Sequence, residues 1–183
     1  MFPLEKNLTY EDFLEFDKSS KDNLEFIDGK VYLLSAPSVI HQTVVTNLST
    51  EFGIYFKGKK CRHFVAPFDV VLSHENVTSK VQPDLTVICD KTGLGEQSYN
   101  GVPELVVEVL SPSTSSVDFI KKMGIYMGAG IKEYWILSPK NNTVQIFSLK
   151  ENGVYAEPIM FSKNDIVKST IFIDLEVKLA DIF

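Results

Sequence analysis

Cysteine, long apolar runs and excess positive charge are all scarce in this sequence. The two cysteines, Cys61 and Cys89, have no metal-binding spacing, which excludes a cysteine metal site and suggests a reducing, cytoplasmic setting. No apolar run approaches the roughly 18 residues of a membrane span. The N-terminus has no basic stretch before an apolar core. We therefore expect no signal peptide and no membrane partner.

The remaining composition is that of an ordinary soluble globular protein, with 44% hydrophobic and 23% charged residues. A length of 183 residues predicts one domain over residues 1–183 with a sizeable core. The net charge of −6 is uneven: residues 1–28 contain eight acids and three lysines, a net of −5, which leaves −1 for the rest. A near-neutral body can still bind phosphate through a local basic patch or a divalent cation. Charge therefore does not exclude a nucleic-acid partner.

Capping and turn signals divide the first half of the chain. Thr9, with Asp12 three residues later, resembles a capping box and predicts a short helix. Two alternating runs around residues 28–29, Asp-Gly, predict a hairpin. Apolar spacing predicts an amphipathic helix that is capped by Ser38 and ends near Gly58. Strands are expected near 62–66, 68–72, 85–89 and 104–110.

The second half continues with a helix between Ser/Thr caps and glycines over 111–130, a strand in "KEYWILSP", and a hairpin turning at residues 152–153, Asn-Gly. The sequence contains no internal repeat, low-complexity tract or interdomain linker. The pattern predicts an α/β or α+β fold, in which a mixed β-sheet is flanked by helices.

Two carboxylates occupy positions where an apolar residue would be less costly. In the strand "ELVVEVL", Leu105, Val107 and Val109 point to one face, and Glu108 points to the other with Val106. A mid-strand carboxylate costs several kcal/mol unless a basic group, hydrogen bonds or a metal ion compensates it. A buried structural ion pair explains Glu108 as well as a functional site does.

Asp84 follows Pro83 at the start of "LTVIC", a second buried strand. Asp after Pro is ordinary turn chemistry, and its carboxylate can cap a backbone. However, two carboxylates from neighbouring strand ends also suit a hard cation such as Mg²⁺, which keeps several waters and binds substrate phosphate.

The helix after Glu108 adds a lysine. Asp118, Lys122 and Tyr126 lie four residues apart on one face. An Asp–Lys pair at this spacing can simply stabilise the helix surface. A lysine directed at the sheet can instead stabilise charge on a phosphoryl group.

These stretches resemble the Uma-type family of restriction-endonuclease-like proteins within the PD-(D/E)xK nuclease superfamily. The resemblance rests on "QPD", "VVEVLSPSTSSVDFIKKMGIYMGAGIKEYWIL", "EFIDG", "APS" followed by His-Gln, "APFDVVL" and the terminal "DIF". It implies a restriction-endonuclease-like core with a Mg²⁺ or Mn²⁺ site. By position, it assigns Asp84 and Glu108 as metal ligands. The superfamily lysine is missing two residues after Glu108, where Leu110 stands, and Lys122 is favoured over Lys121 as its replacement.

Two further residues are candidate accessory groups. Glu25 can add an acid near the site or be an exposed hairpin carboxylate. His41, in the first turn of the long helix, can meet phosphate or be structural. The basic cluster "KGKKCRH", residues 57–63, can contact a nucleic-acid backbone or be a solvated loop.

The resemblance implies a metal-dependent endonuclease that hydrolyses phosphodiester bonds, with DNA as the expected partner and Asp84, Glu108 and Lys122 as its catalytic residues. The alternatives are a catalytically degenerate nucleic-acid- or protein-binding module, and an acid–lysine network without metal. The sequence leaves a homodimer open.

Overall fold

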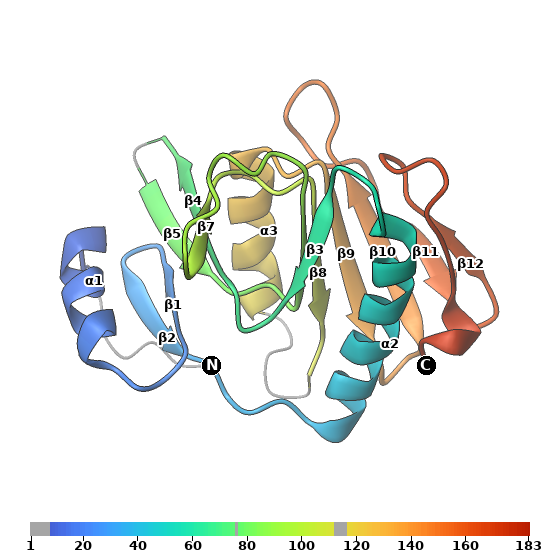
Figure 1. Ribbon diagram of the computed structural model, residues 1–183, viewed down its shortest axis with the longest axis horizontal. Helices are drawn as coiled ribbons and strands as arrows, with labels where there is room; N and C mark the ends of the chain where they lie inside the picture. The colour runs from blue at the N-terminus through green and yellow to red at the C-terminus, as the bar shows by residue number, and fades with distance from the viewer. Residues whose placement is uncertain (1–7, 76, 112–116) are drawn as a thin grey trace.

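Three α-helices and three β-sheets are present in the residues that the computed structural model describes, which are 8–75, 77–111 and 117–183, without the side chains of Val117 and Asp118 (Figure 1). The largest sheet has six strands, in the order β11 (Ile159–Ser162), β10 (Thr143–Ser148), β9 (Glu133–Ser138), β8 (Leu105–Val109), β6 (Leu85–Ile88) and β3 (Arg62–Val65). The second has five, in the order β2 (Lys30–Leu33), β1 (Leu24–Ile27), β5 (Val77–Val81), β4 (Asp69–His74) and β7 (Ser98–Asn100). Strands β12 (Ile166–Lys168) and β13 (Glu176–Lys178) form the third, followed by the short 3-10 helix η1 (Leu179–Asp181).

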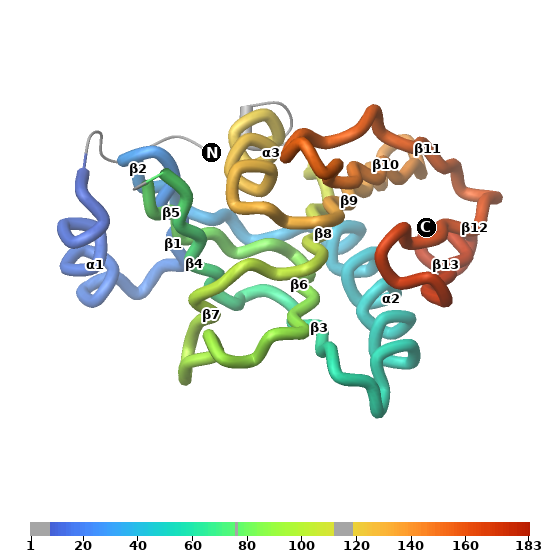
Figure 2. Tube along the Cα trace, turned by 90° about the horizontal axis from the view of Figure 1, so that it is seen from above, coloured from blue at the N-terminus to red at the C-terminus, as the bar shows by residue number. Residues whose placement is uncertain are grey.

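Helices α2 (Val39–Phe56) and α3 (Val117–Ala129) lie on opposite sides of the six-stranded sheet (Figure 2). The α2 face of β8 carries Leu105, Val107 and Val109, and the α3 face carries Val106. This split follows the alternation predicted for "ELVVEVL", so Glu108 lies on the α3 side. Helix α3 connects β8 to β9, which pair in parallel, whereas β8 pairs antiparallel with β6. The predicted mixed sheet flanked by helices is confirmed.

Helix α1 (Tyr10–Ser19) packs against β1, where the rings of Phe13 and Phe26 stack with centroids 4.9 Å apart. The predicted capping box is present, because Thr9 Oγ1 accepts the Asp12 N–H and the Asp12 carboxylate accepts the Thr9 N–H. The hairpin between β1 and β2 turns at Asp28 and Gly29 with φ of 50° and 68°, as an Asp-Gly turn requires.

The strands β5, β7, β12 and β13 were not predicted. Strand β5 completes a hairpin with β4 and contributes Lys80, which is 5% exposed. Its ammonium donates to Asp17 Oδ2 at 2.8 Å and to Asp69 Oδ2 at 3.0 Å. Asp69 is therefore part of a partly buried group of ion pairs that ties α1 to the five-stranded sheet.

The prediction of a reducing setting from the cysteines is not supported, because Cys61 and Cys89 form a disulfide. Arg62 on β3 pairs with Ile88 on β6, so the antiparallel register places the two cysteines opposite each other. A separation of 28 residues gave no sign of this in the sequence. No helix in the described ranges combines the length and apolar character of a membrane span.

Candidate active site

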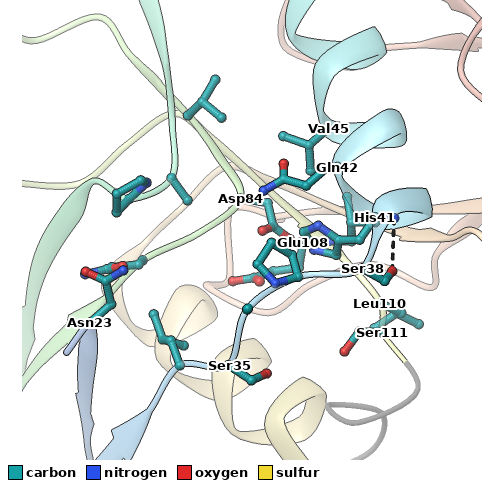
Figure 3. A pocket seen from close by; sticks show the side chains of 18 of the residues that line it. Asn23, Ser35, Ser38, His41, Gln42, Val45, Asp84, Glu108, Leu110 and Ser111 are labelled. Atoms are coloured by element: carbon teal, nitrogen blue, oxygen red, sulfur yellow. Dashed lines mark hydrogen bonds and ion pairs between the residues drawn. The ribbon is translucent and has the colours of Figure 1, made fainter.

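Asp84 and Glu108 meet at one end of the six-stranded sheet. Leu85 on β6 pairs with Val107 on β8, and continuing this antiparallel register by one residue sets Asp84 opposite Glu108. The Val109 N–H donates a 2.7 Å hydrogen bond to Asp84 Oδ2, which fixes that carboxylate beside the strand. Both acids line a pocket of about 480 Å³ (Figure 3). The structure thus brings the two predicted acids together.

His41 reaches the same pocket from the first turn of α2. Ser38 caps this helix and accepts the His41 N–H at 3.3 Å. The ring Nε2 lies 3.2 Å from Asp84 Oδ2, while Nδ1 is buried and has no hydrogen-bond partner among the described residues. Burial lowers the pKa of His41, but the Asp84 carboxylate outweighs burial and raises it. His41 is therefore brought to Asp84, where it helps to orient the carboxylate.

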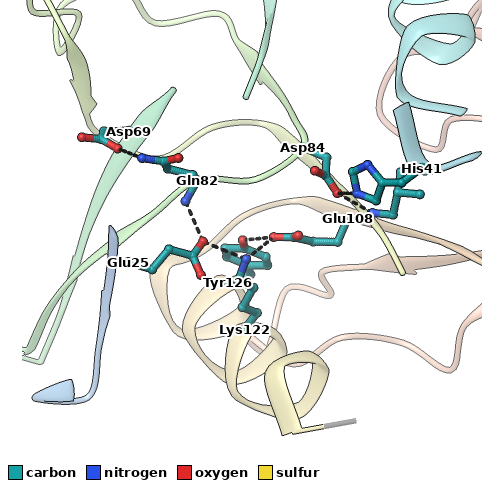
Figure 4. Close-up of polar contacts among 9 residues, drawn as sticks. Glu25, His41, Asp69, Gln82, Asp84, Glu108, Lys122 and Tyr126 are labelled. Atoms are coloured by element: carbon teal, nitrogen blue, oxygen red, sulfur yellow. Dashed lines mark hydrogen bonds and ion pairs between the residues drawn. The ribbon is translucent and has the colours of Figure 1, made fainter. Parts of the chain in front are cut away.

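Lys122 extends from α3 to Glu108, whereas His41 contacts Asp84. Its Nζ donates to Glu108 Oε1 at 3.0 Å, and the Tyr126 hydroxyl donates to the same oxygen at 2.6 Å (Figure 4). The neighbouring Lys121 instead donates to the Tyr32 hydroxyl at 2.8 Å. The lysine that meets Glu108 is thus Lys122, as the helical rotation suggests. The Asp118 side chain lies outside the described residues.

Glu25 is not an exposed hairpin carboxylate. It is fully buried on β1, and its Oε1 lies 2.8 Å from Lys122 Nζ and accepts the Gln82 N–H at 2.8 Å. It does not belong to the pocket lining, which includes Lys122, Asp84 and Glu108. The structure therefore places Glu25 behind the lysine and does not expose it in the pocket.

Burial and mutual charge perturb the proton affinities of this cluster. Burial raises the pKa of Glu108 to about 7, against the lowering effect of the Lys122 ammonium. Burial also disfavours charged Lys122, but the carboxylates of Glu108 and Glu25 raise its pKa well above the usual value. Perturbed titratable groups gathered in a concave site are typical of functional sites, although structural ion pairs also produce them.

Two carboxylates, and no larger group of described metal-binding side chains, are available to a hard cation at this site. The described contacts of Asp84 involve Oδ2 and those of Glu108 involve Oε1, so their second oxygens, Oδ1 and Oε2, are the donors left for a ligand. The described residues contain no group of three or more His, Cys, Asp or Glu side chains placed to hold a metal. Mg²⁺ commonly uses one or two carboxylates and completes its shell with water and phosphate. The two acids fit this mode of binding.

Sequence reasoning missed two contributors to the site. It placed Tyr126 on the lysine face but did not anticipate its hydrogen bond to Glu108. In the motif "QPD" only Asp84 was predicted to contribute to the site, and Gln82 was not. The Gln82 N–H donates to Glu25, and the Gln82 side chain donates to Asp69 at 2.6 Å. The Glu-to-Tyr spacing of 18 residues gave no local signal for the first contact.

None of the residues of the basic cluster, 57–63, is among the described residues that line this pocket. The cluster begins directly after the C-terminal end of α2, whereas His41 occupies the N-terminal turn. At 1.5 Å per residue, the helix separates Lys57 from His41 by roughly 24 Å. The other end of the cluster, His63, is on β3, two residues before Val65 of the pocket lining. Among the described residues that line the pocket, Lys122 and His41 are the only basic ones.

Residues 10–180 match the model of the Uma2 family, described as "Putative restriction endonuclease". The chain belongs to the Uma2 family. This Uma2 chain is also 26% identical, over 147 residues, to the uncharacterized protein slr1290 of Synechocystis sp., with 80% of the chain and 76% of that protein covered.

The fold is shared with a crystal structure described as a putative nuclease belonging to DUF820 from Anabaena variabilis. The TM-score is 0.80 at 19% identity, and the match covers 96% of this chain and 97% of the other. The predicted restriction-endonuclease-like fold is thereby confirmed. At this identity the likeness concerns the fold, so the chemistry depends on the residues described above.

Proposed function

We propose that this chain is a metal-dependent nuclease that hydrolyses phosphodiester bonds, with DNA as the substrate. The observation that carries the proposal is the meeting of Asp84, Glu108 and Lys122 in one pocket, from two neighbouring strands and a helix. Membership of a family described as "Putative restriction endonuclease" supports it. The replacement of the strand lysine by Leu110 does not count against it, because Lys122 Nζ reaches Glu108 from α3.

Asp84 and Glu108 would hold one or two Mg²⁺ or Mn²⁺ ions. When bound, such an ion polarises a phosphate and lowers the pKa of a coordinated water. Asp84 is oriented for this role by the Val109 N–H and His41. Because the described part of the pocket lining contains two acids and a single lysine, it has little positive charge of its own to bind phosphate. A cation would supply that charge.

Lys122 would act on the substrate itself. A water attacks phosphorus in line with the leaving oxygen, and negative charge increases on the phosphoryl oxygens. The ammonium of Lys122, which lines the pocket and stays protonated because of its two carboxylate neighbours, stabilises that charge. A homodimer that cuts both strands and a cytoplasmic location stay predictions, and the disulfide removes one of the two grounds for the location.

The test is cleavage of supercoiled plasmid with Mg²⁺ or Mn²⁺, combined with thermal melting across a cation titration. We expect cation-dependent nicking and a cation-dependent rise in melting temperature for the native chain, and neither for Asp84→Ala. A melting temperature that does not change with cation concentration, together with no cleavage, would indicate the structural acid–lysine network. Cation binding without cleavage of plasmid, single-stranded DNA or RNA would indicate the degenerate binding module.

A further inference from the structure

Glu25 is a fully buried carboxylate that the proposed hydrolysis does not use directly. Its Oε1 contacts Lys122 Nζ and the Gln82 N–H, both at 2.8 Å, and its Oε2 has no hydrogen-bond partner among the described residues. Burying a carboxylate costs several kcal/mol unless it is well paired. The burial of Glu25 therefore calls for an explanation, either a contribution to stability or a role in function.

Lys122 lies between two carboxylates that face different ways. Glu108 lines the pocket and lies 3.0 Å from Nζ, while Glu25 lies behind the lysine, outside the pocket lining (Figure 4). The two acids also come from different sheets, since β8 belongs to the six-stranded sheet and β1 to the five-stranded sheet. The position of the ammonium therefore depends on both sheets.

A lysine carried by a helix needs such a second contact. A lysine two residues after Glu108 on the same strand would have its direction fixed by the sheet, but Leu110 occupies that position. Lys122 instead has a flexible four-carbon stem on α3. With Glu108 as its only carboxylate partner, its ammonium would pair fully with Glu108 and compete with a cation for that carboxylate.

We propose that Glu25 is a positioning residue, which shares the Lys122 ammonium with Glu108 and prevents it from pairing fully with Glu108, so that Glu108 can bind a cation while the lysine faces substrate phosphate. This inference rests on the proposed function. Glu25 acts through Lys122 and is not itself a cation ligand. The Gln82 N–H fixes the Glu25 carboxylate for this task, and the Gln82 side chain anchors the same segment to Asp69.

The test is a double-mutant cycle on Mn²⁺ affinity, measured by calorimetry, with Glu25→Gln and Lys122→Met. Glu25→Gln keeps the size of the side chain and an oxygen for the Gln82 N–H, and removes the charge. We expect it to weaken Mn²⁺ binding about tenfold, as loss of an outer-shell partner typically does. In the Lys122→Met background the same change should alter affinity less than about twofold, because no ammonium is left to position.

Additive effects in the cycle would overturn the inference, since they would mean that Glu25 attracts the cation directly. The control is Glu133→Gln, which neutralises an equally buried carboxylate on β9 that is hydrogen-bonded to Ser169 and Thr170, and should leave Mn²⁺ affinity unchanged. If the native chain binds no Mn²⁺, the proposed function fails and this inference fails with it. If it binds and the cycle is additive, only the inference fails.

A crystal structure of Glu25→Gln gives a second readout in case Lys122→Met does not fold. The inference predicts that Nζ of Lys122 moves away from residue 25 and closer to Glu108 than the native 3.0 Å. An ammonium that keeps its native position would contradict it.

Discussion

Lys122 Nζ lies 3.0 Å from Glu108 Oε1, although the two residues belong to a helix and a strand and are 14 positions apart. The contact places a buried ammonium beside the acid that the PD-(D/E)xK resemblance assigns to the metal. In the superfamily pattern the lysine follows the acid by two residues on the strand. Here a lysine reaches the acid from the helix, so the geometry of the site depends on how α3 packs on the sheet.

Lys122→Met should abolish most of the activity and also destabilise the fold. Removing a group that stabilises transition-state charge costs about 10²–10³ in kcat. Leaving Glu25 and Glu108 without their buried partner costs about 3–5 kcal/mol in the free energy of unfolding. Plasmid cleavage and urea unfolding measure the two effects.

Lys121→Met is the matched control, because Lys121 contacts Tyr32 and does not reach Glu108. It should leave kcat within about twofold, since it touches no group of the site, and cost about 1 kcal/mol in the free energy of unfolding for the lost hydrogen bond to Tyr32. Equal losses of activity in both variants would mean that Lys122 has no special role in the site.

His41→Asn should weaken cation binding and cleavage about tenfold, because a group that orients a metal-binding carboxylate usually contributes this much. His41 lies 3.2 Å from Asp84, whereas His63 is a second partly buried histidine that contacts Ser49 outside the pocket. His63→Asn therefore serves as the control. A change in Mn²⁺ affinity as large for His63→Asn as for His41→Asn would rule out the orienting role.

Glu133 should make the free energy of unfolding depend on pH. Burial raises its pKa above the ordinary 4.5, although hydrogen bonds from Ser169 and Thr170 oppose the shift. The folded chain thus holds this proton more tightly than the unfolded chain does. The stability that Glu133 contributes is fully present below pH 4.5 and is lost as pH rises through the folded pKa.

Urea unfolding of the native chain and of Glu133→Gln, from about pH 4 to 8, measures this contribution as a difference. We expect the stability of the native chain, relative to the variant, to fall with rising pH above 4.5. A difference that is constant or rises with pH would contradict the shift.

The disulfide between Cys61 and Cys89 should contribute about 3–4 kcal/mol, since it closes a loop with a separation of 28 residues. Urea unfolding with and without a reductant measures this contribution. The Cys61→Ser/Cys89→Ser double variant should match the reduced native chain. Two titratable thiols in the unreduced, unfolded protein would show that the bond does not form.

Local signals predicted much of the fold. The Thr9 capping box, the turn at Asp28 and Gly29, and the Ser38 cap all formed as expected, because each depends on residues within a few positions. Strand β5 was missed because Thr78, Ser79 and Lys80 give it a polar appearance, yet Ser79 and Lys80 are buried by contacts with distant segments.

The candidate site was predictable only where the residues next to a functional residue in the sequence make it stand out. Asp84 and Glu108 are conspicuous because apolar strands surround them. The burial of Glu25 was not predictable, because its partner Lys122 is 97 positions away and the register of two sheets brings them together. The pairing of Cys61 with Cys89 depends in the same way on the β3–β6 register.

The central claim is that Asp84 and Glu108 hold a divalent cation in the pocket. Anomalous diffraction from crystals soaked in Mn²⁺ tests it most directly. We predict a peak within about 2.0–2.3 Å of an oxygen from each carboxylate, as expected for a small hard cation, and no peak in Asp84→Ala. A pocket without a peak, with Lys122 still paired to both Glu25 and Glu108, would contradict the account.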